Sequence, residues 1–368
     1  MRPPFRGPLE GRTQAQDSTR HLLTLTLIPG LTARAIAQLA QRAPLAEVVA
    51  HPDEHADLVP ETGRAGLRSG RAAERADLES AAAARLGIAL VALPDPRYPA
   101  LLRRIYDPPP VLYVRGVLAE ADDAATVAVV GSRAATAAGR TLARSMARDL
   151  AAWGATVVSG LARGIDTAAH EGALDASGRT VAVLGCGLDR MYPPENERLA
   201  GRITFAGAVV SEFALGTPPL PEHFPQRNRV IAGWSRAVVV VEAAARSGAL
   251  NTARCAADEG RDVLAVPGHP TQPASAGTNQ LIRDGAGLVR SAIDVAQELG
   301  IEPPAATAVP TDSLLGALAG DAPATLEELR DRSGLETGAL LARLTDLELR
   351  DVVRRLPGPL FVRHHQVR

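Results

Sequence analysis

The sequence predicts an α/β fold: a doubly wound parallel sheet in the middle of the chain, with a helical domain before it and a small helix-and-ribbon domain after it. Between Val127 and Gly300, short apolar runs alternate with stretches of helical pattern. The runs are continuously apolar, as strands buried on both faces require. Strands that alternate with helices are accommodated most simply by a parallel sheet covered on both faces. The expected strands are residues 127–130, 155–158, 181–184, 208–210, 237–241 and 263–266.

The charge balance limits the kinds of partner. The 368 residues carry 40 basic and 41 acidic side chains, a formal net charge of -1, and every basic residue is arginine because the chain has no lysine. A near-neutral protein does not coat nucleic acid or acidic membranes through bulk charge, although a local basic site remains compatible. Lysine Schiff-base chemistry is excluded. The length predicts two or three domains.

The cysteines and the N-terminal segment indicate the compartment. Cys186 and Cys255 lie far apart, without a Cys-x-x-Cys pair or histidines at zinc-finger spacing. We therefore expect free thiols in a reducing compartment, no structural metal and no cofactor. Residues 1–20 are expected to be flexible, and they lack the apolar core of a signal peptide. No apolar run approaches the ~20 residues of a membrane span. These features predict a cytoplasmic protein without a membrane partner.

Residues 21–93 are expected to form a helical domain. A Pro29-Gly30 turn separates two helical segments, an arrangement similar to a helix-hairpin-helix or sterile-alpha-motif (SAM) unit. Such units contact DNA or protein, but a packing bundle explains the pattern equally well. The domain of residues 94–300 then begins with a proline-dense connector that ends in a strand-like segment at 111–114.

A Pro/Ala-rich linker at 301–323 leads to a final domain at 324–368. Thr325 is expected to cap a helix at 326–332, Ser333-Gly334 to form a turn, and a second helix to span 336–349 before a ribbon with a Pro357-Gly358 turn. This order is the outline of a winged helix. Acidic residues on the second helix disfavour binding to duplex phosphates, and a protein-docking or dimer module is the alternative.

Ligands of doubly wound sheets bind outside the carboxyl ends of the strands, so these ends are where a site is expected. The first end carries Gly131-Ser132-Arg133, with a helix beginning near Thr136. Free N–H groups, the positive end of a helix dipole and a guanidinium together suit a phosphate. An ordinary tight turn is the alternative.

The second strand end runs from Ser159 and Gly160 through Arg163 to Asp166. Asp166 is expected to cap the following helix, which is simpler than an acid/base pair or half a metal site with His170. The third end, Gly185-Cys186-Gly187, begins like a dinucleotide fingerprint. Arg190 replaces its third glycine, so nicotinamide and flavin binding are not expected.

The fourth cluster combines Phe224 with Arg227, Asn228 and Arg229 in a chain with only 3% aromatic residues. A stacking ring beside guanidinium groups is typical of proteins that hold single-stranded nucleic acid. The alternative is a core phenylalanine, with the arginines paired to Glu212 and Glu242. The fifth end places hydroxyls and free N–H groups at another strand-to-helix junction, again suited to an anion. Its residues are Ser247, Gly248 and Thr252.

In their order and spacing these motifs resemble the DNA-processing protein A family (DprA, also called Smf). The resemblance rests on Gly131-Ser132-Arg133, residues 159–166 with His170, residues 183–187 with Tyr192-Pro193, residues 224–233, Val241-Glu242 with Ser247-Gly248, and residues 265–268. It implies an extended Rossmann-like domain that binds single-stranded DNA, a homodimer, and loading of the recombinase RecA onto DNA during natural transformation and competence. It implies that Gly131, Ser132 and Arg133 hold a phosphate, that Phe224 stacks on a base, and that Arg227, Asn228 and Arg229 complete the groove.

The full predicted DNA-binding set adds the other strand-end residues: Ser159, Gly160, Arg163, Asp166, Gly185, Gly187, Ser247, Gly248 and Thr252. Family members often have a lysine shortly before the phenylalanine, where this chain has Leu220-Pro221-Glu222. That contact is therefore missing here, or an arginine elsewhere supplies it.

The competing hypothesis is a nucleotide hydrolase related to the lysine-decarboxylase-like phosphoribohydrolases. Those enzymes need a Pro-Gly-Gly-x-Gly-Thr phosphate loop, and residues 242–248 of this chain do not provide it. The sequence also shows no nucleophile with an adjacent base, the pairing that covalent catalysis requires. We therefore expect a binding protein without catalytic residues.

Overall fold

The computed structural model describes residues 8–119, 125–303, 314, 318, 323–349, 352–356, 358 and 360–363. The chain divides into two compact units, Met1–Glu302 and Pro303–Arg368, and each is described by itself. Residues 1–7, most of the expected linker at 301–323, and Pro357 of the expected ribbon turn lie outside the described residues.

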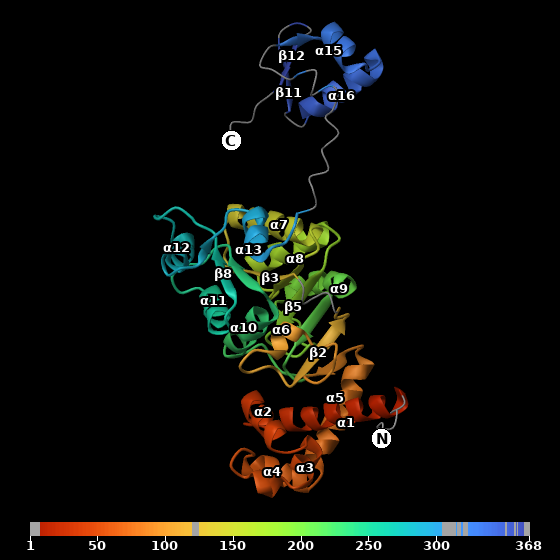
Figure 1. The fold of residues 1–368 in the computed structure, drawn as a ribbon, viewed down its shortest axis with the longest axis vertical. Helices are drawn as coiled ribbons and strands as arrows, with labels where there is room; N and C mark the ends of the chain where they lie inside the picture. Colours follow the sequence, from red (N-terminus) through yellow and green to blue (C-terminus); the bar gives the residue numbers. More distant parts are fainter. Residues whose placement is uncertain are drawn as a thin grey trace, which may run out of the picture. The chain divides into compact units, whose positions relative to one another are not determined.

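A sheet of nine strands forms the centre of the first unit, in the order β1-β2-β6-β5-β4-β3-β7-β8-β9 (Figure 1). The strands from β6 to β9 run parallel, and β1 and β2 add an antiparallel edge. The predicted α/β class with a doubly wound sheet is confirmed. The strands are β1 (Ala89–Ala92), β2 (Val111–Gly116), β3 (Thr126–Val130), β4 (Thr156–Ser159), β5 (Thr180–Leu184), β6 (Ala208–Ser211), β7 (Ala237–Val240), β8 (Asp262–Ala265) and β9 (Gly287–Leu288).

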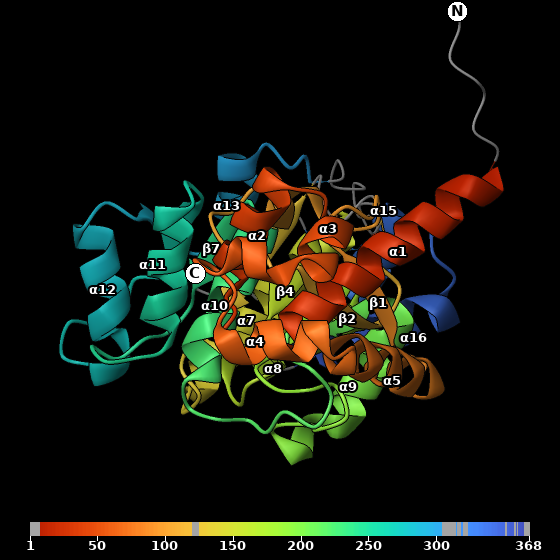
Figure 2. The same ribbon diagram turned by 90° about the horizontal axis from the view of Figure 1, so that it is seen from below.

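Helices cover both faces of the sheet (Figures 1 and 2). Val130, Val158 and Val238 pack with Trp234 on one face, whereas the neighbouring Val129 packs with α7 and α8 on the other. The first face carries α6 (Ala100–Arg103), α10 (His223–Trp234), α11 (Ala249–Asp258) and α12 (Ala276–Arg283). The second face carries α7 (Ala137–Ala152), α8 (Ile165–Asp175), α9 (Glu197–Ala206) and α13 (Ala292–Leu299). Short 3-10 turns lie at Pro194–Asn196 and Pro273–Ser275.

The N-terminal helices share their core with the sheet. Leu22, Leu25 and Leu39 belong to the same buried cluster as Tyr113 of β2 and Leu184 of β5. Figure 2 shows these helices in front of the β1–β2 edge. They are α1 (Pro8–Thr26), α2 (Ala33–Arg42), α3 (Leu45–Ala50), a 3-10 turn (Pro52–His55), α4 (Glu61–Arg68) and α5 (Arg71–Arg85).

Two features of this region differ from the sequence expectation. Helix α1 begins at Pro8, inside the segment expected to be flexible. The sequence did not indicate this start, because residues 8–20 contain too few apolar residues to show a helical period. Strand β1, Ala89–Ala92, falls within the expected helical domain and pairs with β2. Its alanine-rich composition does not distinguish a short strand from a helix end. None of the helices in the described part of the chain has the length and apolar character that a membrane crossing requires.

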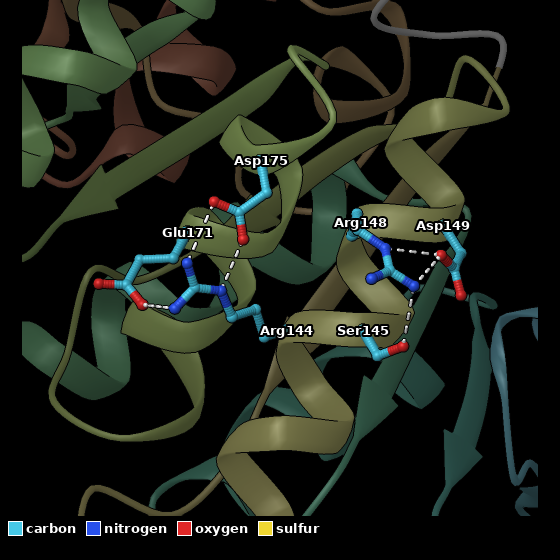
Figure 3. Close-up of polar contacts among 6 residues, drawn as sticks. All are labelled: Arg144, Ser145, Arg148, Asp149, Glu171 and Asp175. Carbon is cyan, nitrogen blue, oxygen red and sulfur yellow. Dashed lines mark hydrogen bonds and ion pairs between the residues drawn. The ribbon is translucent and has the colours of Figure 1, made fainter. Parts of the chain in front are cut away.

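Helices α7 and α8 cross at very close range (Figure 3). A side chain at Gly172 of α8 would overlap the carbonyl of Arg144 on α7. The Arg144 guanidinium spans the crossing, with its Nε 2.6 Å from Asp175 Oδ2 and its Nη1 3.1 Å from Glu171 Oε2. Each of these helices starts at a loop that leaves the sheet, so the crossing fixes the two loops relative to one another.

The second unit has the helices and strands of a winged helix. Thr325 and Glu328 form a capping box, and Gly334 ends the first helix with φ 70°. Leu314 and Leu318, which lie in the expected linker, are buried in this unit's core with Leu344. The elements are β10 (Ala324–Thr325), α15 (Leu326–Ser333), α16 (Thr337–Leu349), β11 (Val353–Leu356) and β12 (Leu360–Arg363), with strand order β10-β12-β11.

The α7–α8 crossing gives a stability prediction. Gly172→Ala should lower the free energy of unfolding by roughly 1–3 kcal/mol, because the added methyl group forces two packed helices apart. Gly201→Ala is the matched control: this helical position in α9 has open space around it. The control should raise stability by about 0.5–1 kcal/mol, because alanine loses less backbone entropy than glycine on folding. Denaturant unfolding checks both, and equal effects of the two substitutions would contradict the packing argument.

Candidate nucleic-acid interface

The sheet reverses its winding direction at β3. The chain passes from β3 to β4 on one side and returns later to β7 on the other side. At such a reversal the loops after the two strands diverge and leave a crevice at their carboxyl ends. A cavity of about 520 Å³ opens there. The predicted residues that line it are Gly131, Ser132, Arg133, Asp166, Phe224, Arg227, Asn228, Ser247, Gly248 and Thr252.

Phe224 lies at the start of α10 and is half-buried at the cavity wall. The guanidinium carbon of Arg133 is 4.9 Å from the centre of the Phe224 ring, within the range of a cation–π contact. The ring of Tyr192 is 5.6 Å away, centre to centre, at a tilt of 48°. Phe224 is therefore not a fully buried core residue, because it is half-buried and lines the cavity.

Two exposed arginines line the cavity without a carboxylate partner among the described residues: Arg133 and Arg246. Arg246 and the neighbouring Asn251 were not among the predicted site residues. The available signal was their place in the same strand-to-helix junction as Ser247 and Thr252. The hydroxyls of Ser247 and Thr252 were given weight there, and the guanidinium directly before Ser247 was overlooked.

Arg227, in contrast, is buried. Its Nη1 donates to the carbonyl of Gly160 at 2.8 Å and to the carbonyl of Val183, and its Nε donates to Asn228 Oδ1 at 3.3 Å. Burial lowers the pKa of Arg227 to about 10, so the group remains charged at neutral pH. The side chain joins the carboxyl ends of β4 and β5 and does not pair with Glu242.

The buried Asp166 accepts hydrogen bonds from the N–H groups of Gly160 at 3.1 Å and Ala162 at 3.4 Å. The expectation that it caps α8 is wrong, because the N-cap is Gly164 and the carboxylate turns back to the preceding loop. Burial raises the pKa of Asp166, and the charge of Arg227 opposes that rise. His170 bonds through Nδ1 to Thr180 Oγ1 at 2.7 Å, and burial lowers its pKa to about 3. Neutral His170 therefore does not form an acid/base pair with Asp166.

The N-terminus of α7 already holds an anion. Thr136 caps the helix by accepting from Gly139 N at 3.0 Å, and the Glu242 carboxylate accepts from Thr136 N at 2.9 Å and from its hydroxyl. Gly139 makes this possible, since any side chain there would overlap the carboxylate. We expected this helix end to be free for phosphate. It is occupied, so an incoming anion meets the loop of Ser132 and Arg133 instead.

The other predicted residues lie outside this cavity. Arg229 pairs with Glu212 and donates to the carbonyl of Asp107, as the structural alternative had it. Ser159 is buried, and its hydroxyl donates to Val129 O at 2.7 Å. Arg163 pairs with Glu195 and, with Gly160, lines a small adjoining hollow that also contacts Phe224.

Gly185 and Gly187 are positions of close approach. A Cβ atom at Gly185 would lie 3.1 Å from Phe224 Cδ1, and one at Gly187 would lie 2.6 Å from the carbonyl oxygen of Ala214. Gly185 therefore makes room for the ring of Phe224, and Gly187 lets two loops pack together. Both glycines shape the wall near the site without lining the cavity.

Comparison with known proteins gives consistent matches. Residues 89–300 match the family described as DNA recombination-mediator protein A, and residues 302–359 match the DprA winged helix domain. Protein Smf of Escherichia coli (strain K12) is 41% identical over 277 residues, which cover 71% of this chain and 74% of that protein. DNA processing protein DprA of Streptococcus pneumoniae (strain ATCC BAA-255 / R6) is 47% identical over 204 residues, covering 55% and 72%.

Solved structures agree with this match. The X-ray structure of DNA processing protein A from Streptococcus pneumoniae superposes with a TM-score of 0.59 at 36% identity, covering 75% of this chain and 95% of that one. DNA processing protein A from Helicobacter pylori, whose structure was reported for its single-stranded DNA binding mode, gives a TM-score of 0.50 at 30% identity and covers 55% and 92%. On its sequence matches and its fold, the chain belongs to the DNA recombination-mediator protein A family, the DprA family that its motifs resemble.

Proposed function

We propose that this protein binds single-stranded DNA in the cavity between the ends of β3 and β7, in a DNA-processing role in natural transformation. The observation that carries the proposal is the Arg133 guanidinium held 4.9 Å from the Phe224 ring at the cavity wall. A guanidinium over an aromatic ring combines a cation for a phosphate with a ring for a base, the pair of groups that holds single-stranded nucleic acid. The single-stranded DNA binding mode reported for the Helicobacter pylori relative supports it.

The cavity sets the size of what enters. At about 520 Å³ it falls in the range of roughly 300–1,000 Å³ that encloses a small ligand, which fits a nucleotide unit of a single strand and not a duplex. In this proposal a base stacks on Phe224, and Arg133 and Arg246 bind the phosphates on either side. Arg246 takes the place of the lysine that is missing near Leu220.

We extend the proposal to the partners that family membership implies. The protein acts as a homodimer in the cytoplasm and loads RecA onto the strand it holds. It binds DNA without breaking a bond in it, since His170 is buried and neutral and Asp166 is engaged by two backbone N–H groups. Neither group is free to act as a base at the cavity.

The first test uses salt. Arg133→Ala should weaken binding to oligo-dT and reduce the magnitude of the slope of log K against log salt by about 0.7, because one phosphate contact is lost. Arg148→Ala is the control: this arginine of α7 pairs with Asp149 (Figure 3). The control should change neither quantity. Fluorescence anisotropy at several salt concentrations measures both, and an unchanged slope in Arg133→Ala would remove Arg133 from the phosphate contacts.

The second test concerns stacking. Phe224→Ala should cost roughly 1–3 kcal/mol of binding free energy, the usual loss for one stacked base. Phe205→Ala is the matched control, since Phe205 is 94% exposed on α9 and does not line the cavity. Titration of both variants with the same oligonucleotide gives the difference. Equal losses would mean that Phe224 acts only through general surface hydrophobicity.

The third test separates the two units. A chain ending at residue 302 should retain the single-strand affinity of the full chain, because every residue proposed to bind DNA lies before that point. Gel shifts with single- and double-stranded DNA on both chains show whether the winged helix adds duplex binding. Loss of single-strand binding on truncation would place the site elsewhere, and release of free base from a nucleoside monophosphate would support a hydrolase instead.

A further inference from the structure

We propose that Arg227 is a positioning residue of the DNA site. Its side chain holds the ends of β4 and β5 and the Phe224 ring in place, and it does not bind phosphate. This inference depends on the single-stranded DNA binding proposed above. It assigns different roles to two arginines that line the same cavity, Arg133 and Arg227.

The first step is where the donors of Arg227 point. The residue is 4% exposed. Nη1 donates to the carbonyls of Gly160 and Val183, and Nε donates to Asn228. A Cβ atom at Gly160 would lie 2.7 Å from the guanidinium carbon, so the glycine is what lets the group reach the strand ends. Nη1 and Nε are therefore engaged by the protein itself, whereas Nη2 has no hydrogen-bond partner among the described residues.

The second step is what this bonding holds in place. Both backbone groups of Gly160 are hydrogen-bonded: its carbonyl accepts from Arg227, and its N–H donates to Asp166. The next residue, Leu161, is fully buried with φ 55°, a left-handed conformation that is unfavourable for leucine. Such a conformation persists only where its surroundings fix it, and the hydrogen bonds on Gly160 do so.

The third step connects this loop to the DNA contacts. At the far end of the loop, Ile165 N donates to the carbonyl of Ser132 at 3.3 Å, and Gly164 packs directly on the backbone of residues 132 and 133. Arg227 also lies one helical turn after Phe224, with its guanidinium carbon 5.9 Å from the ring centre. The buried guanidinium therefore lies beside the ring that receives the base and holds the start of the loop at Gly160, while the Arg133 side chain is not bonded to it.

Salt dependence distinguishes a positioning role from a phosphate contact. Removing a phosphate ligand lowers both the affinity and the number of counterions released. Removing a group that only shapes the site lowers the affinity and leaves the salt slope unchanged. Stacking provides an independent readout, because 2-aminopurine in the strand changes its fluorescence when it stacks on an aromatic ring.

The experiment uses full-length Arg227→Met with an oligonucleotide carrying 2-aminopurine. We expect at least a ~10-fold loss of affinity, a wild-type salt slope and loss of the stacking signal, whereas Arg133→Ala reduces the slope by about 0.7. Arg227→Lys keeps the charge without the fork and should recover little of the affinity. Arg261→Met is the matched control, because Arg261 also donates to two backbone carbonyls, those of Leu101 and Gly233, away from this cavity. The control should bind DNA like wild type.

Gly160→Ala covers the case in which Arg227→Met does not fold, since it displaces the guanidinium without removing a charge. It should reproduce the loss of affinity at constant slope. A slope reduced as in Arg133→Ala, recovery of binding in Arg227→Lys, or wild-type affinity in a folded Arg227→Met or Gly160→Ala variant would overturn the positioning role. Failure of the wild-type protein to bind the oligonucleotide would instead overturn the proposed function.

Discussion

Charged side chains that bond to backbone groups at the strand ends hold the walls of the cavity in place. Where a ladder stops, N–H and C=O groups must still be satisfied, and leaving them unpaired away from water is costly. Arg227 donates to two carbonyls, and Asp166 accepts from two N–H groups. Glu242 accepts from the N–H group of Thr136 at the start of α7. These three charged side chains bond to the protein itself. Arg133 and Arg246 line the cavity without a carboxylate partner among the described residues.

The parts that the sequence predicted are those determined by composition over several residues. The continuously apolar runs matched β3 to β8, and Thr325 with Gly334 marked the ends of α15. Strand β9 has two residues, too few to produce a pattern. Strand β1 begins and ends with alanine, a residue that does not distinguish a strand from a helix end. The polar clusters after the strands did assemble around one cavity, because parallel strands end at the same edge of a sheet.

The role of each polar side chain was harder to predict, because it depends on the direction in which the side chain points from its helix or loop. Arg227 and Arg229 are two positions apart, about 200° around a helix, so one turns into the cavity wall and the other toward Glu212. Sequence spacing reveals that difference only when the start of α10 is known. The same holds for Asp166, whose side chain turned back to Gly160 and Ala162 where a forward cap was expected. The near-neutral total charge has a similar explanation: Arg144, Arg163 and Arg229 pair with acidic residues, whereas Arg133 and Arg246 at the cavity have no carboxylate partner among the described residues.

The carboxylate of Glu242 also bears on which anions compete for the cavity. In many sheets of this type, the first helix end binds the terminal phosphate of a free nucleotide through its open N–H groups. Here that end is filled from within, and Gly139 provides the space for it. An anion that enters the cavity therefore does not reach the N–H group of Thr136, because the Glu242 carboxylate already accepts from it. Under the proposed function, this closed helix end removes one contact that the terminal phosphate of a free nucleotide would otherwise make.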